Sequence, residues 1–232
     1  MSSYLLALDA SSSACSAALI RAEGEHRECL ARFEHTPRAH TQRLMPMVDE
    51  VLTEAGITPQ ALDGVAYGQG PGSFTGLRIA AGAAQGLAFG LDCPLVGVST
   101  LEALALQAHR RYHFRHIVTA LDARMGEVYT AVWHCQDDVA KRLDSEVVVA
   151  PQHVTLPAFE PDWVGVGSGF TLWEQFDDLL KASMTQHLDD LEPRAEEMAW
   201  IGLRALQNGG GKAPIEVQPV YLRNDVAWKK PA

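Results

Sequence analysis

The sequence predicts an α/β protein made of two related lobes. Three observations lead to this prediction. The chain has 232 residues, which is long enough for two lobes of about 100 residues each. Patterns typical of strands and of helices alternate along it. Finally, Ala7-Leu8-Asp9-Ala10 recurs as Ala120-Leu121-Asp122-Ala123, each time between two strand-like runs. A repeated strand–turn–strand unit indicates an internal duplication.

The first half of the chain predicts the element order βββαβαβα. Residues 40–55 carry apolar side chains at helical spacing, and Gly56 follows as a C-terminal cap. Ser99 is suited to cap the start of a later helix. The other runs are short and apolar, as strands are. The expected strands are 5–8, 15–20, 27–33, 65–67 and 94–98; the expected helices are 40–55, 75–90 and 99–110, with a short turn or helix at 58–59.

The second half starts the same pattern again. We expect strands at 117–121, 128–133, 146–149 and 163–166, helices near 172–181 and 195–207, and an irregular tail over 215–232. We therefore place the first lobe at residues 1–112 and a second, smaller lobe at 113–232. The last long helix, about 195–208, is expected to pack on the first lobe.

Composition excludes several classes of function. The formal net charge is −10, and because phosphate contacts need a basic surface, the chain alone is a poor binder of RNA or DNA. It is equally unsuited to an anionic membrane, and no apolar segment is long enough to span one. The N-terminus lacks the basic region of a signal peptide. The four cysteines have spacings that fit no zinc site. These features favour a cytoplasmic protein with reduced thiols.

The repeated hairpins have a chemical use. A hairpin turn offers backbone N–H groups to phosphate oxygens, and a carboxylate at the strand end can hold a cation. Two such hairpins facing each other would grip a nucleotide triphosphate, as in actin, sugar kinases and Hsp70-type ATPases. The candidate nucleotide-binding residues are Asp9, Ser11, Asp122 and Gly167. The alternative is that both aspartates only cap turns.

A glycine-rich loop at Gly70–Gly76 is the most unusual stretch in the chain. It is not a P-loop, because it lacks the Gly-Lys-Ser/Thr ending. It precedes a helix whose N-terminus Ser73 or Thr75 can cap, which would suit an anion. The alternative is a tight turn that brings the loop against a neighbouring backbone.

Five segments together resemble the bacterial TsaB (YeaZ) family, in the family's order and over nearly the whole chain. Two are specific, GPGSFTGLR at 70–78 and LDARMGEVY at 121–129; three support them, at residues 6–9, 40–47 and 219–223. The resemblance implies a two-lobed actin-like, Hsp70-like fold of the ASKHA type, that is, a duplicated RNase H-like βββαβαβα unit. It also implies a role in forming N6-threonylcarbamoyladenosine next to the anticodon of tRNA.

The resemblance further implies partners and an absence of catalysis. TsaD is the transferase, TsaE is a small ATPase, and members of the TsaB family support them without a catalytic metal site. Thr100 and Leu104 stand where the related enzyme carries two histidines, and leucine cannot ligate a metal. We therefore expect no metal and no catalytic residue in this chain. ATP and Mg²⁺ would act only in the assembled complex, and tRNA would be bound only through that complex.

One pair of histidines mimics a metal site. His109 and His113 have the spacing of one helical turn, with His116 nearby, but they lie among three arginines. Cations next to a site oppose the binding of another cation, so a solvated helix end is the better interpretation.

The helix that follows the glycine-rich loop predicts a contact surface. Gly82, Gly86 and Gly90 form one stripe on it, with Arg78 one turn before. Such a stripe lets another backbone approach closely. Its partner is either the helix at 41–55 of the same chain or a second subunit. Met45 lies off the main apolar stripe of that first helix, so we expect it at an interface with a second copy or with TsaD.

Two other classes of function remain open from the sequence. One is an ATP-dependent phosphotransferase of the sugar-kinase type, and the other is a self-associating protease or chaperone-like protein. Titration of the isolated protein with ATP and magnesium distinguishes a phosphotransferase from a non-catalytic scaffold, because a kinase would bind ATP with micromolar affinity.

Overall fold

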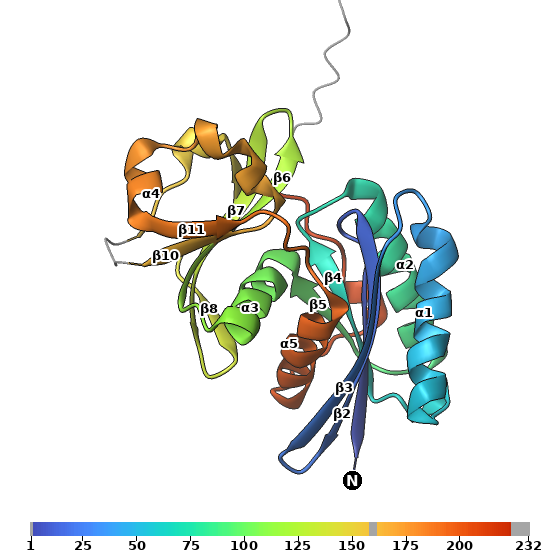
Figure 1. Ribbon diagram of the computed structural model, residues 1–232. Helices are drawn as coiled ribbons and strands as arrows, with labels where there is room; N and C mark the ends of the chain where they lie inside the picture. The colour runs from blue at the N-terminus through green and yellow to red at the C-terminus, as the bar shows by residue number, and fades with distance from the viewer. Residues whose placement is uncertain (1, 158–161, 224–232) are drawn as a thin grey trace, which may run out of the picture.

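The computed structural model describes residues 2–157 and 162–223 of the chain. It contains two β-sheets with helices packed against them (Figure 1). The predicted order βββαβαβα of the first half is confirmed element by element, from β1 to α3. In the part of the chain that the structure describes, no helix is both long enough and apolar enough to cross a membrane.

The first sheet has the strand order β3-β2-β1-β4-β5. Strands β1 (Ser3–Asp9), β2 (Ala14–Glu23) and β3 (His26–His35) form antiparallel hairpins, whereas β4 (Gly64–Gly70) and β5 (Leu95–Ser99) run parallel to β1. Central strand β1 is buried from Leu5 to Asp9 because helices cover both faces of the sheet, which explains its continuous apolar run.

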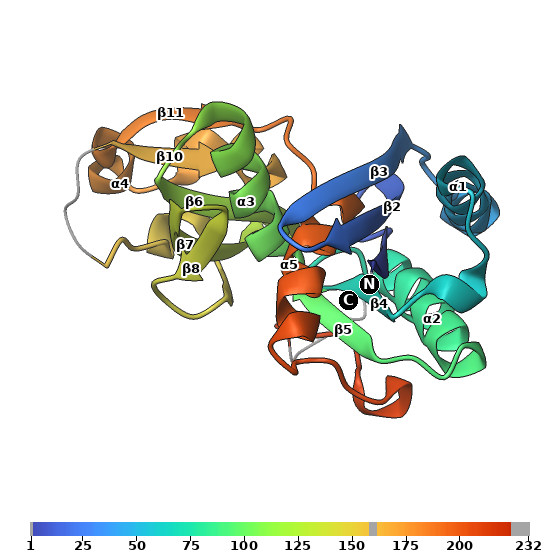
Figure 2. The same cartoon turned by 90° about the horizontal axis from the view of Figure 1, so that it is seen from below.

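Two helices cover one face of this sheet and one helix covers the other (Figure 2). Helices α1 (His40–Ala55) and α2 (Phe74–Gly90) pack on one face, around Leu6, Leu8 and Tyr67. Helix α1 ends at Gly56 in the left-handed conformation, as expected for a C-terminal cap. Helix α5 (Ala195–Gln207) packs on the opposite face against β1, β2 and β4.

The second sheet has the order β11-β10-β6-β7-β8, with β9 paired to β7. It repeats the arrangement of the first sheet, because β6 and β7 form an antiparallel hairpin and β10 lies parallel to β6. The strands are β6 (His116–Arg124), β7 (Glu127–Gln136), β8 (Val139–Arg142), β9 (Val147–Val149), β10 (Trp163–Val166) and β11 (Met184–Leu188).

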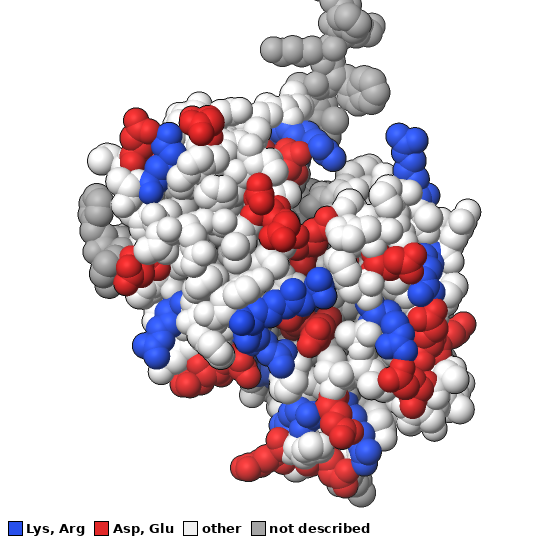
Figure 3. Space-filling model, in the orientation of Figure 1, with Lys and Arg blue, Asp and Glu red and all other residues white. Residues whose placement is uncertain are grey.

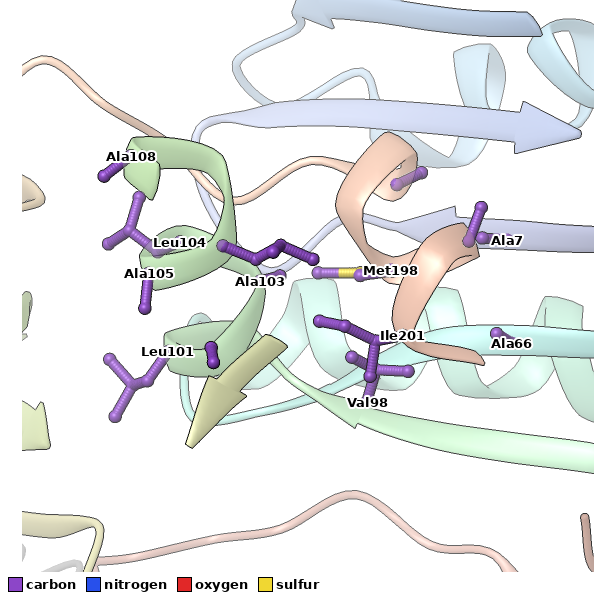
Figure 4. Packing of buried hydrophobic residues seen from close by; sticks show 14 of the residues in the cluster. Ala7, Ala66, Val98, Leu101, Ala103, Leu104, Ala105, Ala108, Met198 and Ile201 are labelled. Carbon is purple, nitrogen blue, oxygen red and sulfur yellow. The ribbon is translucent and has the colours of Figure 1, made fainter. Parts of the chain in front are cut away.

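Helix α3 (Thr100–Tyr112) joins the two halves. Ser99 caps its N-terminus by accepting a hydrogen bond from the N–H of Glu102. The helix lies between the sheets, and one continuous hydrophobic cluster extends from Leu5 of the first sheet to Val164 of the second. Figure 4 shows Ala103 of α3 beside Met198 of α5 within this cluster. The two sheets are therefore fixed to each other through α3.

Three details of the second half differ from the prediction. The single helix expected near 172–181 is wrong: a 3-10 helix, η3 (Ser168–Gln175), is followed by the short helix α4 (Asp178–Ser183). Phe176 leaves the helical conformation and stacks on Phe170, with 4.9 Å between the ring centroids. Strands β8 and β11 were not expected, because they are short, lie at sheet edges and carry many polar side chains.

Short 3-10 helices complete the connections and the tail. They are η1 (Pro59–Ala61), at the predicted turn, η2 (Pro151–His153) and η4 (Pro214–Glu216). After η4 the chain is irregular as far as Arg223, and the N–H of Val220 donates to the carbonyl of Gln69. Residues 224–232 of the expected tail lie outside the described residues.

Candidate functional site

The two hairpin turns face a common cavity between the lobes. Its volume is about 700 Å³, and it is lined by the first turn (11–13), the loop at 72–75 and the second turn (121–124). Of the four predicted nucleotide-binding residues, Ser11 and Asp122 line this cavity. Asp9 and Gly167 lie behind the lining. The fold thus brings the two repeats together, but it exposes only one of the two repeated aspartates.

Asp9 is directed into the protein. Its residue is 1% exposed, and its carboxylate accepts a hydrogen bond from Ser11 Oγ at 3.0 Å. The other oxygen, Oδ1, faces Gly68, where a Cβ atom would lie only 2.1 Å away. Burial raises the pKa of Asp9 to about 7, and the hydrogen bond from Ser11 opposes this rise. This geometry fits a structural carboxyl at the turn.

Asp122 is held within its own turn. Its Oδ1 accepts the backbone N–H of Arg124 at 2.8 Å, and its Oδ2 pairs with the guanidinium of the same arginine at 2.9 Å. Gly167 has a φ of 106°, and a Cβ atom there would lie 2.4 Å from the Ala120 carbonyl oxygen. Gly167 is therefore required for close packing behind the turn.

The glycine-rich loop is pressed against the first hairpin turn. Cβ atoms at Gly72 and Gly76 would lie 2.6 and 1.8 Å from the carbonyl oxygens of Ser11 and Ala10. The N–H of Ser73 donates to the Ser11 carbonyl at 2.8 Å, and the Ser73 hydroxyl caps α2 by accepting from Gly76. The loop has the geometry of the tight-turn alternative, and the predicted cap at Ser73 is confirmed.

The positions where the related enzyme would carry its two histidines are filled by core side chains. Thr100 and Leu104 are completely buried. The Thr100 hydroxyl donates to the Pro71 carbonyl, and a Leu104 methyl group lies 2.7 Å from the position of a Cβ at Gly167. Neither residue offers a metal ligand in an open cavity.

His109 and His113 are part of a helix end. The ring of His109 is hydrogen-bonded to the Phe114 carbonyl at 2.7 Å, and His113 is the left-handed C-cap of α3. Both roles are those expected of a solvated helix terminus.

Sequence comparisons give close relatives over almost the full length. The protein named "tRNA threonylcarbamoyladenosine biosynthesis protein TsaB" of Escherichia coli is 41% identical over 238 residues, covering 97% of each chain. The protein of that name in Haemophilus influenzae is 37% identical, covering 97% of this chain and 96% of its own. The chain belongs to the TsaB family. A family model described as TsaD, tRNA N6-adenosine threonylcarbamoyltransferase, matches residues 33–212.

A solved structure agrees with this assignment. YeaZ from Pseudomonas aeruginosa superposes with a TM-score of 0.87 at 39% sequence identity, over 95% of this chain and all of the other. The predicted family and the predicted two-lobed, actin-like fold are therefore confirmed. The match to the TsaD family model begins within β3 and extends through the second sheet into the segment that follows α5.

In this TsaB-family chain the glycine stripe of α2 points to solvent. Gly82, Gly86 and Gly90 are exposed, and a Cβ atom at any of them would meet nothing within 4 Å. The alternative in which the stripe packs on the helix at 41–55 is therefore wrong. Helix α2 packs inward through a different face, made of Leu77 and four alanines.

Other exposed apolar groups lie on α2 itself and on its neighbour α1. Phe89 is 82% exposed and Met45 is 38% exposed. Arg78 stacks over the Phe74 ring at 3.8 Å from its centroid and donates to the Tyr221 hydroxyl at 3.2 Å. We call Met45, Phe74, Gly82, Gly86 and Phe89 the α1–α2 surface.

Glu192 is a cavity residue that sequence reasoning missed. It contacts Ser12 and Ser13, which lie 180 and 179 positions away in the chain. No local motif surrounds it, because a contact of that separation is created only by the fold.

Proposed function

We propose that this chain is the non-catalytic accessory subunit of a complex that forms N6-threonylcarbamoyladenosine next to the anticodon of tRNA. It would support a TsaD transferase together with TsaE. The observation that carries the proposal is the pair Thr100 and Leu104, which are buried in the core that joins the lobes. The pathway in this proposal is taken from the names of the TsaB relatives, which are threonylcarbamoyladenosine biosynthesis proteins.

The charge distribution supports an indirect role for tRNA. On the face shown in Figure 3, acidic and basic side chains are interspersed and form no broad basic field, and the whole chain carries a net charge of −10. A partner would therefore supply most of the phosphate contacts. We also propose that the protein is cytoplasmic, because the reaction proposed for its complex modifies tRNA.

Reconstitution tests the accessory role. Purified chain, TsaD, TsaE, ATP with Mg²⁺, threonylcarbamoyl-AMP and unmodified tRNA are combined, and each protein is left out in turn. We expect no modification by this chain alone and a large loss when only this chain is omitted. Multiple turnovers by this chain without partners would overturn the proposal.

We further propose that the α1–α2 surface pairs two copies of the isolated chain and is the surface used for TsaD. The exposed glycines of α2, the exposed Phe89 on the same helix and the exposed Met45 on the neighbouring helix α1 offer an apolar area that another helix can approach. Arg78 lies next to this area and adds one charge to it.

Met45→Glu tests this surface. We expect light scattering to show a dimer for the wild type at tens of micromolar and a monomer for Met45→Glu, with unchanged melting temperature. Leu179→Glu is the matched control, since Leu179 is 70% exposed on α4 of the other lobe. A wild type that is monomeric, or a Met45→Glu protein that still dimerises fully, contradicts the surface assignment.

A further inference from the structure

The turn of the first hairpin binds a carboxylate of the same chain, that of Glu192. Ser12 Oγ donates to Glu192 Oε2 at 2.8 Å, and Ser13 Oγ donates to Glu192 Oε1 at 2.6 Å. Each carboxylate oxygen thus receives one hydroxyl. Two hydroxyls that converge on two oxygens of one anion form a recognition site that a phosphate group would satisfy equally well.

Glu192 is fixed in this position by the connection that carries it. It lies between β11 of the second sheet and α5 on the first, and its side chain is only 19% exposed. Three residues later, the N–H of Ala195 donates to the buried Ser16 hydroxyl at 2.9 Å, which anchors the connection to β2. The carboxylate is therefore held close to the serines rather than sampling solvent.

The surroundings of the serines suit an anion. The N–H of Ala14 donates to Ser12 Oγ at 3.2 Å, which leaves the hydroxyl hydrogen of Ser12 for the anion. His35 Nδ1 lies 3.7 Å from Glu192 Oε1. The other charged groups lining the cavity are Asp122, Arg124 and Arg223, and Asp122 is already paired with Arg124. Arg223 is likewise paired with Glu127. Without Glu192, the charged groups of the lining would all be paired, and no unpaired carboxylate of this lining would repel an incoming anion.

We propose that Glu192 is a built-in anion that keeps the serine turn closed, and that a phosphate-class anion from solution reaches Ser12 and Ser13 only by displacing it. The cavity of about 700 Å³ in front of the turn has room for such an anion once the side chain leaves. The turn is thus a latent anion site whose occupancy is set by the position of the 189–194 connection.

Removal of the carboxylate tests the proposal. Wild type, Glu192→Ala and Glu192→Gln are titrated with tripolyphosphate by calorimetry at low ionic strength. We expect Glu192→Ala to bind at least tenfold more tightly than the wild type. Glu192→Gln should gain less, because its amide oxygen still accepts from one serine. It is also the variant that best preserves shape if Glu192→Ala does not fold.

Two controls decide where the anion binds. Asp190→Ala removes the same charge from an exposed position in the same connection, so it should leave affinity within twofold of the wild type. Adding Ser12→Ala and Ser13→Ala to the Glu192 variant should abolish the gain. The proposal is overturned if no Glu192 variant gains affinity, if Asp190→Ala gains as much, or if the gain survives loss of both serines.

Discussion

The two hairpins that carry Ala-Leu-Asp-Ala have the same local sequence and equivalent places in their sheets, but their aspartates differ in environment. Asp9 is almost completely buried, and burial raises its pKa to about 7. Asp122 is partly exposed and paired with Arg124. The difference arises at the strand ends, because Gly68 and Met198 of α5 lie close to the Asp9 carboxyl, whereas Asp122 lines the cavity. Repetition of sequence therefore fixes backbone position without fixing the chemistry of the side chain.

A close-packed glycine lies behind each of the two hairpins. After β4, Gly76 approaches the Ala10 carbonyl; after β10, Gly167 approaches the Ala120 carbonyl. Strands β4 and β10 are the parallel neighbours of β1 and β6. Each hairpin thus has a glycine packed behind it, Gly76 in the first turn of α2 and Gly167 directly after β10. The two contacts differ in position, because Ala10 and Ala120 are not equivalent residues of the repeat.

Substitution of Gly76 should have the largest destabilising effect. Gly76→Ala places a Cβ atom 1.8 Å from a backbone oxygen that cannot move without distorting β1. We expect the free energy of unfolding to fall by about 3 kcal/mol or more, in the range of severe overpacking. Urea denaturation measures it.

Gly82→Ala is the matched control on the same helix. It adds the same atom in open space, so it should stabilise the protein by up to about 1 kcal/mol through helix propensity. Equal losses for both variants would show that contact with Ala10 is not the reason for Gly76.

An effect that develops only as the pH is raised is expected at Asp9. Its pKa in the folded protein is raised from 3.8 to about 7, so the folded state binds the proton more tightly than the unfolded state. The contribution of this carboxyl to the free energy of unfolding is fully present below pH 4 and is lost as the pH rises through 7. Asp9→Asn removes this loss. Relative to the wild type it should therefore gain up to about 4 kcal/mol in unfolding free energy between pH 4 and pH 8, because each pKa unit corresponds to about 1.4 kcal/mol. Chemical denaturation across that range checks it; a flat difference would show that Asp9 is not a buried neutral acid near pH 6.

The fold could be predicted in detail where periodicity is strong. Helix α1 and its cap at Gly56 follow directly from apolar spacing and a left-handed glycine. Edge strands β8 and β11 could not be predicted, because an edge strand pairs with its neighbour without needing an alternating apolar pattern. The break at Phe176 depends on stacking with Phe170, and such a tertiary contact overrides helical propensity.

The candidate site could be predicted only in part. The repeat identified both turns, and the glycine-rich loop was recognised as a close-approach element with a cap at Ser73. The sequence did not show that Asp9 turns inward or that Glu192 reaches Ser12 and Ser13, because both depend on α5 and on the connection that precedes it. Contacts between residues nearly 180 positions apart leave no local pattern.

The smallest effect is expected at Asp122, and it separates the two interpretations of the repeated aspartates. Its ion pair with Arg124 is exposed, and such pairs contribute roughly 0 to 1 kcal/mol. Asparagine would keep an oxygen that accepts the Arg124 N–H, as Asp122 Oδ1 does now. Asp122→Asn should therefore change the free energy of unfolding by less than about 0.5 kcal/mol. The same variant is then assayed in the reconstituted tRNA-modification reaction, where a turn-capping aspartate predicts activity within twofold of the wild type. A tenfold loss of activity at an unchanged melting temperature would contradict this expectation and would make Asp122 a ligand of a nucleotide-bound cation, leaving the buried Asp9 as the structural member of the pair.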